Sequence, residues 1–211
     1  MDIVCLLFDG ITALDIVGPY EVLQRLPEAN VTFVAREAGE VRTDNKFLAL
    51  VADATLDATK RADVLVVPGG FATRALESDT ALLEWIRAID ATSTWTTSVC
   101  TGSMLLAAAG LLEGKEATSH WASLERLRDY GAIPTGRRVV EQGKIVTAAG
   151  VSSGIDMALT LAARVAGDEY AQCIQLGIEY DPQPPFDAGS TAKAPASVLE
   201  TMTGLYGGRG L

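Results

Sequence analysis

Short, nearly uninterrupted apolar runs recur along this chain, and segments of helical character separate them. Residues 3–8 and 64–67 are the purest of these runs, and a glycine-containing turn follows each one. A strand with this pattern is buried on both faces, as in a parallel sheet that helices cover on both sides. Alternation of such strands with helices is typical of α/β proteins. We therefore predict one α/β domain over residues 1–211, a length that suffices for one sizeable core.

Turn residues divide the rest of the chain into further elements. We predict strands at residues 3–8, 31–35, 64–67, 94–99 and 116–119. Helices are expected at residues 14–26 (with a break or late start at Gly18-Pro19), 79–91, 102–109, 121–130, 154–166 and 169–178. Hairpins are expected at residues 40–51 and around Gln142-Gly143. The Pro- and Gly-rich residues 181–211 are expected to form a surface tail that wraps the domain or a partner.

The charge and the cysteine content exclude several classes of function. A formal net charge of −10 argues against a nucleic-acid partner and against an anionic membrane surface. No apolar stretch approaches the ~20 residues of a membrane span, and no secretory signal precedes the first strand. Three widely spaced cysteines, one histidine and the lack of CxxC argue against a disulfide framework and a zinc site. We expect a cytoplasmic protein that holds no metal.

Four predicted loops fall at the same edge of the sheet. Ligands of open α/β sheets bind beyond the carboxyl ends of the strands. The loops at that edge are residues 9–15, 68–71, 100–103 and 150–154, and each carries glycine or a reactive side chain. Their convergence predicts the position of a functional site.

Cys100 is the first candidate for chemistry in these loops. The chain passes from strand to helix within two residues of it, so its sulfur is expected over the sheet edge, at the helix N-terminus. Free N–H groups there favour the thiolate, which is the reactive form of cysteine. The alternative is a small buried hydrophobe, and this is our interpretation of Cys5 and Cys173. Gly102 favours the reactive interpretation of Cys100, because it permits close approach of a substrate.

Asp15 follows the first strand and faces the same edge. One interpretation is that it caps the helix that begins there. The other is that it acts as an acid or base opposite Cys100. A carboxyl beside a thiolate has its pKa raised by the like charge, so it can hold and donate a proton near neutral pH.

His120 and Ser152 are weaker candidates. His120 is the only histidine, so any Cys–His dyad must use it, although a histidine at a helix start or in the core is an equally physical interpretation. Ser152 lies in a GxSxG segment with the strand–turn–helix context of a hydrolase elbow. In that fold the catalytic histidine follows the serine in the chain, and none follows Ser152 here. We therefore reject a serine hydrolase and keep this loop as a wall of the pocket.

The glycine pair after the third buried strand offers backbone donors. Gly69-Gly70 is too short for a phosphate loop and lacks its lysine. It is either a plain turn or a source of N–H groups for developing negative charge. In the second case we expect the N–H of Gly70 to act together with the N–H of Thr101.

Together these segments resemble the DJ-1/PfpI superfamily over nearly the whole chain. The general elements are Asp15 in its LDxxGP segment, Pro68-Gly69-Gly70, the Cys100 elbow and Gly150 with its turn. More specific are residues 98–103 (SVCTGS), 117–121 (ATSHW), 176–180, 184–186 and 188–190, which resemble the isocyanide hydratase branch. The protease-like members carry histidine directly after the cysteine, where this chain has Thr101. A hydratase is expected to carry Ile-Thr where this chain has Val151-Ser152.

The resemblance implies a flavodoxin-like three-layer sandwich with a mostly parallel sheet, a nucleophile elbow and a homodimeric assembly. It implies hydration of an organic isocyanide to an N-formamide, with Cys100 as nucleophile and Asp15 as acid and base. Backbone N–H groups of Gly70 and Thr101, or the loop of Val151 and Ser152, are expected to stabilise charge. Trp121 and Phe71 are expected to line a pocket for a small apolar substrate. No cofactor is needed, because hydration moves no electrons.

Two other interpretations remain open. A glyoxalase or deglycase of the same superfamily uses the same cysteine and acid. A non-catalytic sensor of small molecules or of oxidation is the second, because AraC-like regulators carry a related domain. Such regulators append a basic helix-turn-helix region, which is not seen before the end at Leu211.

Overall fold

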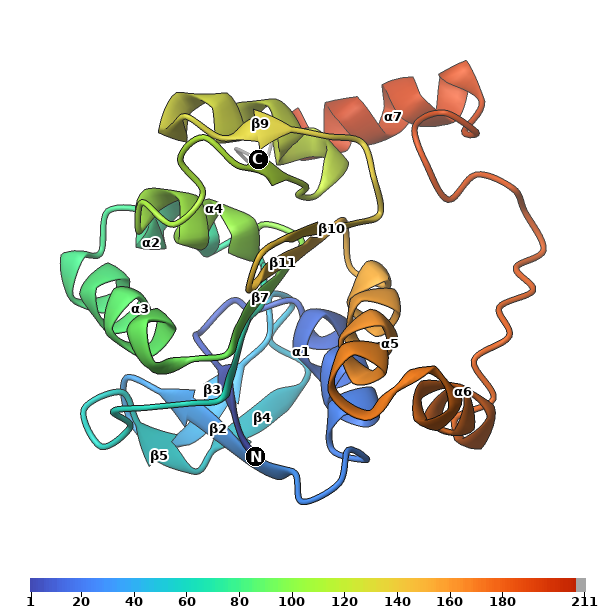
Figure 1. Ribbon diagram of the computed structural model, residues 1–211. Coiled ribbons are helices and arrows are strands. Elements are labelled where there is room, and N and C mark those ends of the chain that lie inside the picture. The colour runs from blue at the N-terminus through green and yellow to red at the C-terminus, as the bar shows by residue number, and fades with distance from the viewer. Residues whose placement is uncertain (208–211) are drawn as a thin grey trace.

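The computed structural model describes residues 1–207 and forms a helix–sheet–helix sandwich (Figure 1). The central sheet has seven strands in the order β10-β11-β7-β6-β1-β2-β5. All neighbouring strands pair in parallel except β10 and β11, which form an antiparallel hairpin at one edge. The strands are β1 (Asp2–Leu6), β2 (Asn30–Ala35), β5 (Ala54–Thr55), β6 (Val64–Val67), β7 (Trp95–Val99), β10 (Val139–Gln142) and β11 (Ile145–Ala148). The predicted α/β class with a mostly parallel sheet is confirmed.

Helices cover both faces of this sheet. Alternate residues of β1 point to opposite sides, so Ile3 and Cys5 join one apolar cluster while Val4 and Leu6 join the other. The first cluster includes α1 (Ala13–Leu23), α5 (Ser153–Ala166) and α6 (Asp168–Gly177). The second includes α3 (Thr80–Thr92), α4 (Gly102–Ala108) and the 3₁₀ helix η1 (Trp121–Tyr130), with α2 (Thr73–Leu76) packed beside α4. The apolar runs of the sequence are thus buried on both faces, as expected.

Smaller elements complete the chain. The predicted hairpin at residues 40–51 is confirmed as β3 (Gly39–Arg42) paired with β4 (Ala49–Ala52). A two-residue strand, β8 (Glu116–Ala117), pairs with the unpredicted β9 (Ile133–Pro134). Among the described residues, no helix combines the length and apolarity needed to cross a membrane.

The predicted break at Gly18-Pro19 is wrong. Helix α1 runs through both residues without interruption. Proline lacks an N–H, so Pro19 removes the helical hydrogen bond that the carbonyl of Asp15 would otherwise accept. The ends of α1, at Ala13 and Leu23, also lie within three residues of those predicted.

Helices α1 and α5 pack closely against each other beside the end of β7. A side chain at Gly154 would meet Pro19 Cγ and Val99 Cγ2 at 3.0 Å each. An added methyl group would crowd both side chains, so the glycine favours close approach of α1, α5 and the end of β7. The turn that precedes α5 is thereby held against the loop that follows β7.

The tail contains a helix that was not predicted. Residues after Tyr180 run without regular structure and then form α7 (Ala196–Gly207), which returns at the top of Figure 1. Tyr206 of α7 contacts the rings of Phe71, His120 and Trp121. Residues 208–211 of the predicted tail lie outside the described part.

Candidate active site

Cys100 occupies a strained elbow between β7 and α4. Its φ angle of 58° is left-handed, a conformation that costs about 1–3 kcal/mol in a residue other than glycine. Its N–H donates to the carbonyls of Ala148 and Ala149 at 3.1 and 3.0 Å. Its own carbonyl accepts the hydroxyls of Ser103 and Ser119, both at 3.1 Å. These four contacts hold the backbone of the elbow that carries the sulfur.

Gly102 permits this elbow to lie close to the neighbouring strand. A Cβ at this position would come within 2.2 Å of the Val67 carbonyl oxygen and 2.8 Å of the Pro68 carbonyl oxygen. Both obstacles are backbone atoms that cannot rotate away. The glycine that the sequence suggested for substrate access therefore serves packing of the elbow against β6.

Asp15 lies in the first turn of α1 and is fully buried. It does not cap the helix, because the N-cap position belongs to Thr12. Its Oδ2 accepts the N–H of Gly69 at 2.9 Å, whereas Oδ1 has no N–H or O–H donor among the described residues. The thiol of Cys100 also interacts with this carboxyl. The structure thus brings together the two side chains predicted to act as a pair.

Burial is the main cause that raises the pKa of Asp15 to about 7. The charge of Asp44 raises this pKa further, while the Gly69 N–H and the Cys100 thiol lower it. A carboxyl in this state carries a proton over much of the neutral pH range. The geometry therefore provides a proton donor next to the sulfur.

The pKa of Cys100 differs from the expectation that this position favours thiolate. Burial, and then the charge of Asp15, raise the pKa of the thiol. The backbone N–H groups of Thr101 and Val151 face the sulfur and lower the pKa, without offsetting the burial. The physical reason is that a largely buried sulfur loses hydration, and two amide dipoles replace only part of the stabilisation that water would give the thiolate. These influences favour the thiol form of Cys100.

The backbone N–H groups that face the sulfur differ from the expected pair of Gly70 and Thr101. The N–H of Gly70 donates to the hydroxyl oxygen of Thr101 at 3.0 Å, so it is already engaged. The expected cooperation of Gly70 and Thr101 N–H groups is therefore wrong for this structure. Thr101 and Val151 supply the amides that face the sulfur. Val151 has a φ angle of 41°, so the second donor, like Cys100, lies on strained backbone.

A pocket of about 120 Å³ opens beside the sulfur. It is lined by Thr12, Asp44, Gly70, Phe71, Cys100, Thr101, His120, Val151 and Tyr206. Two predicted wall residues lie elsewhere. Ser152 is exposed and accepts a hydrogen bond from Arg138 at 3.2 Å, and Trp121 lies behind His120 and Tyr206. The pocket-wall prediction is thus wrong for Ser152, and Trp121 supports the wall without lining it.

His120 combines the two interpretations that the sequence left open. It is the N-cap of η1, and its Nδ1 accepts the N–H of Ala122 at 3.3 Å. Burial lowers its pKa, so the neutral ring is favoured. The ring also lines the pocket. No hydrogen bond joins it to Cys100 within the described residues, so it acts there as a wall and not as the base of a dyad.

Three pocket residues were not anticipated: Thr12, Asp44 and Tyr206. The hydroxyl of Thr12 donates to Asp44 Oδ2 at 3.0 Å, which links the first loop to the β3–β4 hairpin. Nothing in the sequence places that hairpin at the site. The helix that carries Tyr206 could have been predicted from the sequence, because Leu199, Met202 and Tyr206 follow helical spacing after Pro195.

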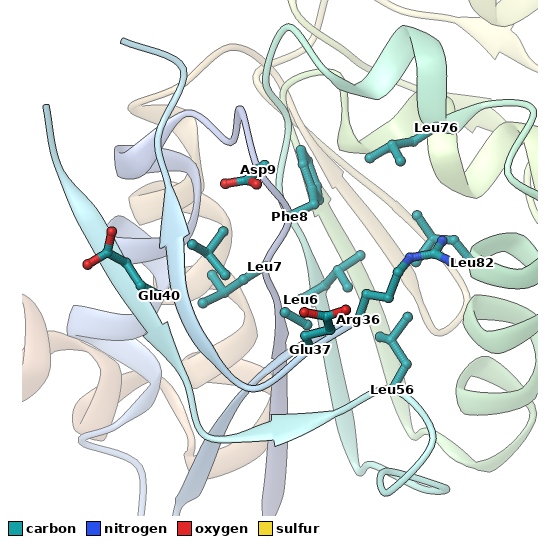
Figure 2. A pocket seen from close by; sticks show the side chains of 12 residues that line it. Leu6, Leu7, Phe8, Asp9, Arg36, Glu37, Glu40, Leu56, Leu76 and Leu82 are labelled. Carbon is teal, nitrogen blue, oxygen red and sulfur yellow. The ribbon is translucent and has the colours of Figure 1, made fainter. Parts of the chain in front are cut away.

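A second and larger cavity lies apart from this chemistry. It measures about 340 Å³ and is bounded by the ends of β1 and β2 and by the helices beyond them. Figure 2 shows the side chains that line it, which include the apolar Leu6, Phe8 and Leu56 and the charged Asp9 and Glu40. Neither Cys100 nor Asp15 lines it. Among the described residues, no group of three or more His, Cys, Asp and Glu is placed to hold a metal ion.

Known proteins with similar sequences identify the family of this chain. The DJ-1/PfpI family model matches residues 1–164. An isonitrile hydratase of Pseudomonas putida is 45% identical over 195 residues, which cover 92% of this chain and 85% of that protein. An HTH-type transcriptional regulator of Pseudomonas aeruginosa is 32% identical over 65% of this chain, but the match covers only 41% of the regulator.

Solved structures show the same relationship. The crystal structure of a ThiJ/PfpI family protein from Pseudomonas syringae superimposes with a TM-score of 0.93 and 42% identity, covering 97% of this chain and 85% of that one. Drosophila melanogaster DJ-1beta, at 22% identity and a TM-score of 0.75, shares the fold. From the matched residues and the superposition, the chain belongs to the DJ-1/PfpI family.

Proposed function

We propose that this protein hydrates organic isocyanides to N-substituted formamides. The observation that carries the proposal is the buried pair of Cys100 and Asp15 at a small pocket. The similarity to the Pseudomonas putida isonitrile hydratase supports it, since isonitrile and isocyanide name the same group. The enzyme is then a hydro-lyase with a cysteine nucleophile.

The first step joins sulfur and a proton to one carbon. The terminal carbon of R–N≡C accepts electrons from Cys100 Sγ and also takes up a proton. This addition breaks one carbon–nitrogen π bond and forms the thioimidate R–N=CH–S–Cys. Asp15 gives its proton to this carbon and takes the thiol proton in exchange, so the carboxyl is protonated again after the step. The raised pKa values of Cys100 and Asp15 suit this step, because a free thiolate is not required before the substrate arrives.

Water completes the reaction. It adds across the C=N bond of the thioimidate: its hydroxyl group goes to carbon, and its other proton reaches nitrogen through Asp15, which gives a proton to nitrogen and takes one from water. In the collapse of R–NH–CH(OH)–S–Cys the carbon–sulfur bond breaks and the hydroxyl proton passes through Asp15 to the departing sulfur, which gives R–NH–CHO and the thiol. The balance is one isocyanide plus one water to one formamide, so no cofactor is required. The amides of Thr101 and Val151 stabilise charge on sulfur during its departure.

One experiment tests the function against its rivals. The purified protein is mixed with an alkyl isocyanide, and N-formamide is followed by mass spectrometry. We expect turnover by the wild type, none by Cys100→Ala, and full activity in the matched control Cys173→Ala, whose cysteine is exposed and remote. Full activity of Cys100→Ala overturns the covalent mechanism. Turnover of methylglyoxal in place of isocyanide identifies a glyoxalase, and binding without turnover identifies a sensor like the regulators that share part of this chain.

We also propose a homodimer in the cytoplasm. Leu176 and Phe186 are 79% and 78% exposed on α6 and the tail, which supports an apolar contact with a second copy. Three free cysteines support a reducing compartment. Light scattering on the purified protein tests the first point, and a monomer at micromolar concentration contradicts it.

A further inference from the structure

Helix α7 reaches the pocket through one face only. Its half-buried large side chains are Leu199, Met202 and Tyr206, which are spaced three and four residues apart and so share one face. The neighbouring Leu205 is 55% exposed. Of these side chains, only Tyr206 lines the pocket beside Cys100.

Tyr206 is held there by aromatic contacts. Its ring centroid lies 5.1 Å from that of His120 and 5.6 Å from that of Trp121, both edge-on, and 6.3 Å from that of Phe71. Edge-on aromatic pairs at these distances are attractive beyond their buried area. The ring is thus a positioned wall and not a loosely packed surface side chain.

The pocket that it bounds is small. At about 120 Å³, it is well below the 280 Å³ cavity that lies on the other side of His120 and Val151. Pockets for drug-sized ligands usually measure 300 Å³ or more, as a rough guide. Such a space suits the isocyano carbon and a compact apolar substituent. A bulky substituent on the nitrogen would meet the Tyr206 ring.

We propose that Tyr206 is a specificity-determining residue that restricts the enzyme to isocyanides with compact apolar substituents. This proposal rests on the proposed function for its substrate class. The restriction is steric: the ring, not the hydroxyl, occupies the space into which a larger substituent would extend. Removal of the ring therefore admits larger substrates.

The test compares two substrates across five proteins. The kcat/KM for methyl isocyanide and for 2-naphthyl isocyanide is measured for wild type, Tyr206→Ala, Tyr206→Phe, Met202→Ala and Leu205→Ala. We expect Tyr206→Ala to shift the ratio toward the naphthyl substrate by about tenfold or more, since even one methylene in an apolar pocket changes specificity by this order. The Tyr206→Phe variant should keep the wild-type ratio. An unchanged ratio in Tyr206→Ala overturns the proposal.

Two controls separate specificity from loosening of the helix. Met202 lies on the same half-buried face without lining the pocket, and Leu205 points outward. Both alanine variants should keep the wild-type ratio. If Met202→Ala reproduces the shift of Tyr206→Ala, the effect comes from helix docking and the role of the ring is contradicted.

An assay without isocyanide distinguishes failure of this proposal from failure of the proposed function. Alkylation of Cys100 by iodoacetamide and by N-(1-pyrenyl)maleimide is followed by peptide mass spectrometry, which separates Cys100 from Cys173. In Tyr206→Ala, labelling by the pyrene reagent should rise about tenfold relative to iodoacetamide. No relative rise contradicts the steric role of Tyr206 even if no isocyanide is turned over.

Discussion

Two regions of the site differ in how tightly they are packed: the residues around Cys100 and Asp15, here called the floor, and the side of the pocket formed by α7, here called the outer wall. At the floor, Asp15, Cys100 and Thr101 are buried, and backbone atoms of three strand ends surround them. At the wall, α7 is largely exposed and follows a long stretch without regular structure. The floor belongs to the sheet that organises the whole core, whereas this part of the wall comes from α7.

This difference separates two tasks. Proton transfer and nucleophilic attack depend on fixed distances between atoms, and the floor allows almost no added atom. Selection among substrates depends on the shape of the remaining space, and changes in α7 alter that shape without disturbing the sheet. The following predictions test whether the two regions are as independent as their packing indicates.

The largest effect is expected from the acid at the floor. Asp15→Asn keeps an oxygen for the Gly69 N–H but removes the transferable proton. We expect kcat/KM for formamide formation to fall by roughly 10²–10⁴, the usual contribution of general acid–base catalysis. Asp9→Asn, an exposed carboxyl in the same loop, should retain activity. A loss below about tenfold in Asp15→Asn would mean that Asp15 does not transfer the proton.

Packing at the floor gives the next effect. Gly102→Ala places a methyl group against two backbone carbonyls. We expect the free energy of unfolding in urea to fall by about 3 kcal/mol or more, as for severe overpacking. Gly136→Ala meets no heavy atom within 4 Å and serves as control. Equal stability of the two variants would show that the elbow yields more easily than its contacts suggest.

The pH dependence of stability tests the buried carboxyl itself. Asp15 has a pKa of about 7 in the folded protein, against an ordinary value of 3.8. The unfolded chain therefore releases this proton first, and stability from this group falls as pH rises from about 4 to about 7. In urea unfolding at several pH values, Asp15→Asn should lose that part of the slope. A parallel slope in both proteins would place the pKa of Asp15 near its ordinary value.

Asp44 should give the smallest effect. Its charge raises the pKa of Asp15 from the hairpin side of the pocket. Asp44→Asn should move the alkaline fall of the rate profile to lower pH, by less than about one unit. The measurement is kcat/KM against pH, with Asp53→Asn, at the position directly after β4, as the control. A shift to higher pH would contradict the conclusion that Asp44 raises the pKa of Asp15.

Much of the floor could be predicted from the sequence. Apolar runs identified β1 and β6, and the abrupt strand-to-helix change identified the Cys100 elbow, because local pattern decides both. Asp15 and Cys100 meet since parallel strands end at one edge. The state of the thiol could not be predicted, because its pKa depends on how completely side chains from distant segments exclude water.

Other parts of the site depend on contacts between remote segments. Asp44 reaches the pocket through a hairpin whose placement no local pattern records. The N–H of Gly70 is taken by the Thr101 hydroxyl, a bond that only the assembled loops reveal. Helix α7 had the necessary spacing, but its Gly- and Pro-rich surroundings indicated a tail.

The glycine between α1 and α5 has a consequence for reading the sequences of relatives. A side chain at the position of Gly154 in a relative crowds Pro19 and Val99, and a shift of α5 away from them relieves that crowding. Because Val151 is attached to the start of α5, its amide would retreat from the sulfur as the helices separate. That single position therefore serves as a sequence marker for whether a relative can keep the same amide beside its cysteine.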